Sequence, residues 1–429
     1  QWTVLFAAWL GWGFDVFDGL LFNFVAPSCV PVLLHLPLGT PEARSATLLW
    51  TGVLSATLLL GWAVGGIVFG WIGDRIGRTR TLMITMALYS LGTAACAFAP
   101  NIWVLLGCRI VASLGIGGEW AAGAAMVAEV VPNHRRVEAG ALLYTSAPLG
   151  LFLATQATWL IQGVVLPGSP EWSWRVVFLC GLVPAAVALA VRWFVEEPAR
   201  WATVAAASAP PRLPELFAPA MVRRTLSGLG MAVVALLMWW ACNAFIPVIA
   251  SGLAEVEAGA RGLDPRATTG LKESWKALST NLFNLGGLIG TLLTVPLSKS
   301  IGRRPMFAAY FVGSAFALAL AFVAPLPPVG RLYAYFPIGL TVFGVFGSFT
   351  YYLPELFPTR LRATGAGFCY NAGRVVAAGG PFLVGWVASR GADALGTAMG
   401  VLGWVALVPV VGLGLLPWVV ETRDSPLED

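Results

Sequence analysis

Long apolar stretches separated by short polar ones run along the whole chain. A helix needs about 20 apolar residues to cross a hydrocarbon core of about 30 Å, and these stretches lack the two-residue alternation of barrel strands. The pattern predicts an all-α membrane protein with twelve transmembrane helices. The predicted spans lie near residues 2–32, 47–73, 81–99, 102–130, 137–165, 174–195, 223–252, 273–298, 305–324, 331–353, 363–388 and 395–420.

One long polar break, EEPARWATVAAASAPPRLPELFAPAMV, falls in the middle of this series. It predicts an N-terminal six-helix bundle over residues 1–195 and a cytoplasmic linker over 196–222. A C-terminal six-helix bundle over 223–420 and a cytoplasmic tail over 421–429 follow.

The two predicted bundles share sequence features at an offset of 225–226 residues. Gly61 and Gly65 reappear as Gly286 and Gly290, and GDRIGRTR reappears as SKSIGRRP. Each match is weak alone, but together they indicate a duplicated six-helix unit. Duplicated halves with a site between them near the midplane are typical of alternating-access transporters.

Lys and Arg are about twice as frequent in one set of alternate loops as in the other, which predicts that the richer set is cytoplasmic. The richer set includes Arg135 and Arg303, and the poorer set includes Lys272 and Lys276, around a long outer loop expected near 253–272. We therefore expect a multi-pass protein of the plasma (inner) membrane with both termini in the cytoplasm.

Composition supports this interpretation and excludes several functions. The chain is 58% hydrophobic and 11% charged, whereas soluble domains are nearer 25% charged. The net charge of +5 is then explained by orientation, and we expect no nucleic-acid partner. The six Cys and two His show no metal or disulfide spacing, and no nucleophile–base pair or nucleotide loop indicates an enzyme. We expect no metal and no cofactor other than a proton gradient.

The segment GWIGDRIGRTRTL after the second span resembles the G-x-L-a-D-R-x-G-R signature of the major facilitator superfamily. Span count, central break and repeats extend this resemblance over the whole chain. Within the superfamily, GIGGEWAAGAAMVAEVVP and PELFPTRLRATGAGFCYNAGR are similar to segments of the proton-coupled metabolite and sialic-acid symporters. EEPARW and VETRD are loose versions of sugar-porter signatures.

The resemblance also implies a cytoplasmic gate of charged residues, which would pair across the two halves when the transporter is open outward. The alternative is that these residues only set the topology. The implied gate residues are Asp74, Arg75, Arg78, Glu129, Glu355 and Arg362.

Five charged residues are expected deep in the bilayer, where each costs about 2.5–3.5 kcal/mol or more and usually marks function. Asp15 and Asp18 are three residues apart and share one helix face, so at least one is a candidate for carrying a proton. Arg109 lies at a depth similar to that of Asp18, and such a pair resembles the proton switch of proton-linked sugar porters; the alternative is a static pair. For Glu119, a structural role and a functional role are both open.

Arg374 is expected near the midplane of the eleventh span. Its planar guanidinium suits a carboxylate, so we predict that it binds the substrate; a structural pair is the alternative. The predicted cavity walls are Gln156, Trp239, Trp240, Asn243, Tyr370 and Asn371.

These features predict a proton-coupled symporter that imports a small organic anion, such as a monocarboxylate, sugar acid or aromatic acid. The expected partners are this substrate, protons and the lipid bilayer, and we expect a monomer. Proton-coupled transport of a sugar or polyol and a non-transporting membrane sensor on the same fold are the alternatives.

Overall fold

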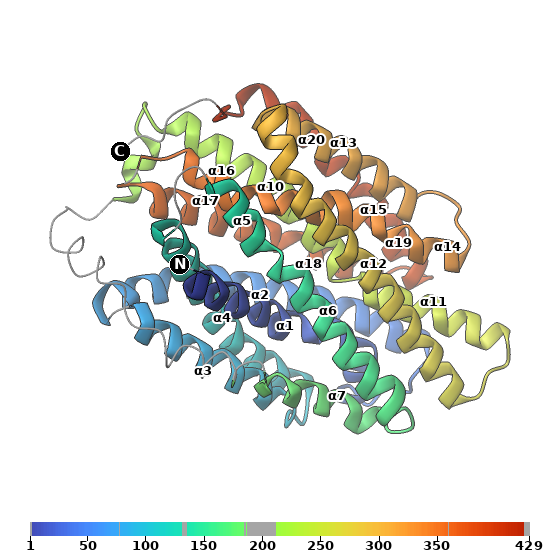
Figure 1. Cartoon of the computed structure of the whole chain (residues 1–429). Coiled ribbons are helices and arrows are strands. Elements are labelled where there is room, and N and C mark those ends of the chain that lie inside the picture. Colours follow the sequence, from blue (N-terminus) through green and yellow to red (C-terminus); the bar gives the residue numbers. More distant parts are fainter. Residues whose placement is uncertain are drawn as a thin grey trace.

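A computed structural model describes residues 2–76, 78–130, 135–183, 186, 212–358 and 360–423. These residues form helices and short connections, as Figure 1 shows. The helices of the first half are α1 Trp2–Leu33, α2 Pro41–Ile76, α3 Arg78–Cys96, α4 Ile102–Val130, α5 Arg136–Tyr144, α6 Ser146–Thr158, η2 Trp159–Val165 and α7 Pro170–Cys180. Those that follow are η3 Leu213–Phe217, α10 Val222–Asn243, α11 Ile246–Ala260, α12 Pro265–Ser300, α13 Arg303–Phe322, α14 Pro328–Tyr333, α15 Tyr335–Ile338, η4 Gly339–Phe343, η5 Gly344–Ser348, α16 Phe349–Glu355, α17 Arg362–Ala377, α18 Gly379–Ala388, α19 Ala394–Trp404, α20 Leu407–Leu415 and η6 Leu416–Trp418.

These helices make up the twelve predicted membrane spans. Within the described residues, eight stretches are long and apolar enough to cross a membrane, and Met83–Cys96 and Ile102–Gly117 are shorter apolar helices. Helix α7 and the pair α17–α18 occupy the two remaining predicted positions. Several spans are built from consecutive segments, such as α5, α6 and η2 for the fifth.

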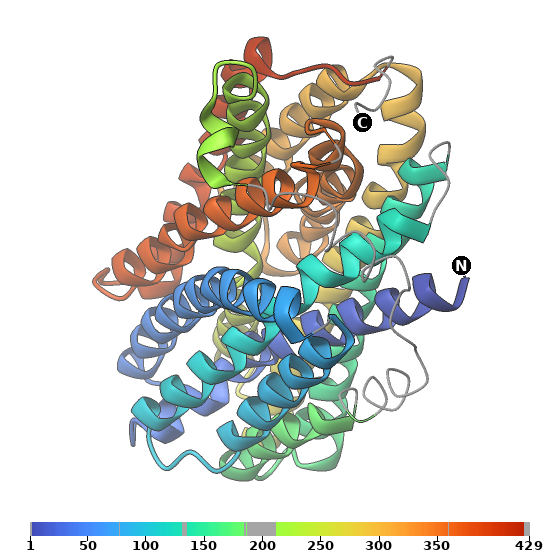
Figure 2. The same cartoon turned by 90° about the vertical axis from the view of Figure 1, so that its left-hand side faces the viewer.

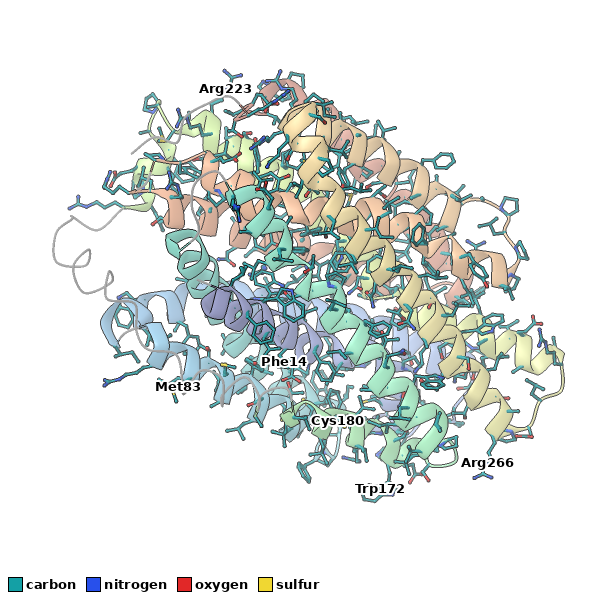
Figure 3. The ribbon with its side chains drawn as sticks, viewed as in Figure 1. Phe14, Met83, Trp172, Cys180, Arg223 and Arg266 are labelled. Carbon is teal, nitrogen blue, oxygen red and sulfur yellow. The ribbon has the colours of Figure 1, made fainter. Side chains whose placement is uncertain are left out.

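The spans form two groups, which Figure 2 shows as blue-to-green helices below and yellow-to-red helices above. We call the end of the molecule that carries the Lys- and Arg-rich loops the inner end, and the opposite end the outer end. Figure 3 shows Arg223 near the inner end, and Arg266 and Trp172 at the outer end. Because the number of spans is even, the two chain termini belong to the same end.

The internal repeat corresponds to equivalent helix crossings in the two halves. A Cβ atom on Gly65 of α2 would collide with the backbone of Leu114 in α4, and one on Gly290 of α12 would collide with Leu340 and Gly344 in the tenth span. Glycine is therefore needed where the second and fourth spans cross and where the eighth and tenth cross. The repeated glycines fix this pseudo-symmetric packing.

The predicted long outer loop is wrong. Helix α11 continues to Ala260, and α12 begins at Pro265 with the Asp264 side chain accepting a hydrogen bond from Ala267 N, at 2.9 Å. Hydropathy detects only the part of a helix that lies in the bilayer, so polar turns that extend beyond it look like a loop. Lys276, which falls inside the predicted eighth span at 273–298 although its charge is counted on the outer side, is a buried residue of α12.

The bundle boundary at residue 195 lies outside the described residues, so the predicted domain limits stay a prediction.

Candidate functional site

A cavity lies between the two halves. Both halves contribute walls: α1, α2 and the fifth span from the first, and α10, the tenth span and α17 from the second. The lining residues are Trp12, Val16, Leu20, Trp62, Tyr144, Ala147, Leu236, Trp239, Trp240, Phe343, Phe346, Tyr370 and Arg374.

Aromatic rings form most of this wall and pack against one another. Trp239 and Trp240 meet edge to face with ring centroids 4.8 Å apart, and Trp240 meets Trp62 of the other half at 6.0 Å. Tyr144 stacks on Phe346 at 5.9 Å, again across the boundary between the halves. Edge-to-face and offset contacts hold such rings in defined orientations, so the cavity has firm, flat, largely apolar walls.

Arg374 is the cation of this cavity, and its side chain is only 2% exposed. The guanidinium carbon lies 4.2 Å from the Trp62 ring centroid and 4.7 Å from that of Tyr370. Arg374 Nη1 donates a hydrogen bond to Asn371 Oδ1 at 2.9 Å, one turn earlier on α17. These contacts hold the guanidinium plane in a fixed position at the cavity wall.

Two indole N–H groups of the cavity wall are buried without an acceptor in the described part of the chain. They are Nε1 of Trp62 and Nε1 of Trp239, which belong to opposite halves. Buried donors without partners are uncommon in folded proteins and call for an explanation. A ligand with acceptor oxygens would supply partners for them.

Asp18 and Arg109 are brought together as predicted, but not as a direct ion pair. Arg109 Nη1 donates to the backbone carbonyl of Asp18 at 3.3 Å, and Nη2 donates to the carbonyl of Gly19. The Asp18 carboxyl is fully buried, and neither of its oxygens has a hydrogen-bond partner among the residues that the structure describes. One of these oxygens faces Gly181 and the Thr93 side chain, so the carboxyl lies inside the first half.

The other predicted wall residues have different positions. Trp239, Trp240 and Tyr370 line the cavity, and Asn371 contacts it through Arg374. Asn243 is buried near the end of α10 and Gln156 is partly buried on α6, and neither belongs to the residues that line this cavity. Contact of these two residues with a substrate stays a prediction.

Most of the predicted gate lies outside the described side chains. This applies to Asp74, Arg75, Arg78 and Glu129, and also to the buried candidate Glu119.

The described gate residues make contacts within the C-terminal half. Glu355 forms a two-pronged ion pair with Arg303 of the same half, at 2.7 and 3.1 Å, and accepts a hydrogen bond from Thr422 Oγ1 at 2.6 Å. Arg362 donates to the carbonyl of Pro354 at 3.1 Å. Pairing of Glu355 across the halves stays a prediction, because the gate residues of the other half lie outside the described side chains.

A different ion pair links the halves at the inner end. Lys299 of α12 pairs with Glu138 of α5, and both side chains are about half exposed. Lys299 belongs to SKSIGRRP, the second copy of the repeated segment, and neither it nor Glu138 is among the predicted gate residues. The signal was weak, since two isolated charges at span ends give no indication that they are neighbours.

The repeated motif at the start of α13 has a structural explanation. Gly302 adopts a φ of 96°, a conformation that glycine tolerates. The Glu421 carboxylate then accepts the backbone N–H groups of Arg303 and Arg304, each at 2.9 Å. Glu421 belongs to VETRD, so this loosely sugar-porter-like segment caps a helix N-terminus.

A second cavity lies at the outer end between the halves. Arg44 of α2 and Lys272 of α12 both contact the Glu255 carboxylate there, at 3.1 and 3.4 Å. One turn further along α12, Lys276 forms a buried ion pair with Glu273 at 2.6 Å. Sequence analysis missed these acidic partners because they were assigned to the outer loop or its edge.

A twelve-helix membrane protein with two similar halves and a cavity between them has the architecture of an alternating-access transporter. The chain belongs to the Major Facilitator Superfamily, whose sequence profile residues 9–381 match. It is a transporter and not an enzyme, and the predicted family and fold class are confirmed.

Similar proteins refine this assignment. One relative is a protein of Cupriavidus pinatubonensis described as a probable 4-methylmuconolactone transporter. The two chains are 30% identical over 431 residues, which cover 100% of this chain and 92% of the relative. It is 26% identical to the gentisate transporter of Corynebacterium glutamicum, covering 89% and 80% of the two chains. The crystal structure of a D-xylose–proton symporter superposes with a TM-score of 0.74 at 17% identity over 99% of both chains, which shows the shared fold.

Proposed function

We propose that this transporter imports a small organic anion together with one or more protons, and that Arg374 binds the carboxylate of the substrate. The observation that carries the proposal is a buried guanidinium fixed at the wall of an aromatic cavity between the halves. A guanidinium presents parallel N–H donors that match a carboxylate. In a water-poor cavity this charged pair would give much of the binding free energy.

The cavity also favours a substrate class. The rings of Trp240, Phe343 and Phe346 in its wall would pack against a flat hydrocarbon. The unpartnered N–H groups of Trp62 and Trp239 suit further oxygen acceptors. We infer a one-ring or unsaturated carboxylic acid with additional oxygen substituents. The relatives named for gentisate and 4-methylmuconolactone support this inference.

For proton coupling, we propose that Asp18 holds a proton in the conformation of this structure. An ionised carboxylate buried without hydrogen-bond donors would be costly, and Arg109 bonds backbone carbonyls beside Asp18 instead of its carboxyl oxygens. Loss of the proton would create an anion beside Arg109 and attract the guanidinium. Asp15, which lies on α1 between the cavity-lining residues Trp12 and Val16, would link the proton site to the substrate site.

The orientation in the membrane that we propose is the one that the charged residues of the loops predict. The Lys and Arg bias supports a plasma-membrane protein with both termini in the cytoplasm, and the cavity is formed within one chain, which supports a functional monomer.

Uptake of labelled gentisate into proteoliposomes tests the proposal. We expect accumulation when the outside is acidic, its loss when a protonophore removes the gradient, and no uptake of labelled xylose. Asp18→Asn should keep gentisate exchange at equal concentrations but lose accumulation. The anion assignment would be contradicted if the protein took up xylose but none of a panel of aromatic and unsaturated acids. Proton coupling would be contradicted if the substrate accumulated without a proton gradient.

A further inference from the structure

The buried ion pair of Glu273 and Lys276 lies within the membrane-spanning part of α12. The helix has 36 residues and is about 54 Å long, so, if it is centred on a hydrocarbon core of about 30 Å, Lys276 lies about one turn inside the outer boundary. Both side chains are almost completely buried, with exposed fractions of 3% for Lys276 and 7% for Glu273. Charges at such depth are unusual and generally have a role in function.

Lys276 also joins the two halves of the transporter. Its Nζ donates to the backbone carbonyl of Phe24 on α1 at 2.9 Å and to Gln162 Oε1 on η2 at 3.3 Å. Gln162 is oriented for this contact, because its Nε2 donates to Ser28 Oγ at 2.8 Å and to Ser173 Oγ at 3.3 Å. The cation thus belongs to the C-terminal half, and the groups that accept from it belong to the N-terminal half.

This contact lies between the two cavities. On α1, Val16 and Leu20 line the central cavity, while Pro27 and Pro31 line the outer one. Phe24, the residue that Lys276 contacts, falls between these two sets along the same helix. The bonds of Lys276 therefore close the two halves together at the level that separates the outer cavity from the central one.

We propose that Lys276 is the outer gate of the transport path: its bonds to Phe24 and Gln162 keep the central cavity closed to the outside, and outward opening breaks them. This proposal depends on the protein being a transporter and not on the identity of the substrate.

A charged gate suits a contact that must form and break in every cycle. In the closed state Lys276 has the Glu273 carboxylate and two oxygens of the other half as partners. In the open state water from the outer cavity would replace the two oxygens, while Glu273, on the same helix, remains as a counterion. A permanent joint would have no need of ions, since well-packed apolar residues often stabilise a buried site as well or better.

Access of a thiol reagent to the central cavity tests the proposal directly. The reference protein has its six native cysteines replaced by Ser and carries Ala147→Cys in the cavity wall. A membrane-impermeant methanethiosulfonate is added to the outside of right-side-out vesicles, without any substrate, and the rate of labelling is measured. Lys276→Gln and Gln162→Ala are introduced separately; the second leaves the buried ion pair intact.

We expect labelling to be about tenfold faster in Lys276→Gln and a few-fold faster in Gln162→Ala, as weaker closure raises the outward-open population. Arg261→Gln is the matched control, because it removes an outer ion pair of 2.7 Å with Glu257 that lies within one helix. This control should label like the reference.

Unchanged labelling in folded, monodisperse Lys276→Gln and Gln162→Ala would overturn the proposal. If Lys276→Gln fails to fold, Gln162→Ala alone decides. Because no substrate is present, these results are independent of whether the anion proposal holds.

Discussion

Replacing Arg374 by Lys keeps the positive charge of the central cavity but removes the planar fork. A lysine ammonium can hold one oxygen of a carboxylate where the guanidinium holds two, and a hydrogen bond to a charged group contributes about 1.5–3 kcal/mol. The stacking of Arg374 on Trp62 at 4.2 Å, about 0.5–2 kcal/mol for a cation–π contact, exists without substrate, so its loss mainly lowers the stability of the fold. The expected loss of binding free energy is about 1.5–3 kcal/mol, which corresponds to a gentisate Kd about 10- to 150-fold higher.

Calorimetric titration of purified protein measures this Kd, and the thermal midpoint shows whether the variant is folded. Arg175→Lys is the matched control: Arg175 also stacks on a tryptophan, Trp174, at 4.2 Å and donates to two backbone carbonyls, but it lies outside the cavity. The control should lose some thermal stability and keep its affinity. An Arg374→Lys variant that binds gentisate as tightly as the unsubstituted protein would refute the reasoning.

Three further predictions concern stability and the inner end. Burial opposes ionisation of Glu421, but the backbone N–H groups of residues 303, 304, 422 and 423 outweigh it and hold the pKa of this carboxyl below its usual value. The stabilisation is therefore present above the pKa of this carboxyl in the unfolded chain, and it is lost as the pH falls through the lower pKa of the folded protein. Glu421→Gln should lower the thermal midpoint at about pH 6 but not at about pH 3. An equal decrease at both pH values would contradict this. Gly290→Ala should destabilise the protein by about 1–3 kcal/mol through overpacking, because a Cβ there would lie 2.8 Å from Gly344 Cα. The control Gly400→Ala, whose Cβ would have nothing within 4 Å, should leave the thermal midpoint unchanged. Lys299→Glu should slow gentisate uptake, because it places a second negative charge opposite Glu138 of the other half. Adding Glu138→Lys should restore the uptake rate. If the double variant does not recover, Lys299 acts in another way.

The sequence was sufficient to predict the spans and several of the charged residues inside them. Hydropathy responds to the bilayer, so twelve apolar stretches and the isolated Arg374 and Asp18 were visible without any knowledge of packing. The offset glycines also indicated the duplicated halves, because Gly65 and Gly290 occupy equivalent crossings.

Contacts between distant helices were not visible in the same way. Nothing in the sequence indicates that Trp62 lies under Arg374, or that Arg303 pairs with Glu355. Lys276 falls inside the predicted eighth span, 273–298, but its charge was counted with the outer loop. The sequence does not show which groups of distant helices accept hydrogen bonds from it.

The central claim is that Arg374 recognises a carboxylate in the aromatic cavity. The most direct test is the ratio of the Kd values of the unsubstituted protein for gentisate and for its amide, which has the same ring and hydroxyl groups but no charge. If Arg374 binds the carboxylate, gentisate should bind at least about tenfold more tightly than its amide, because a charge-assisted hydrogen bond contributes about 1.5–3 kcal/mol. Equal affinity for the acid and the amide would contradict it.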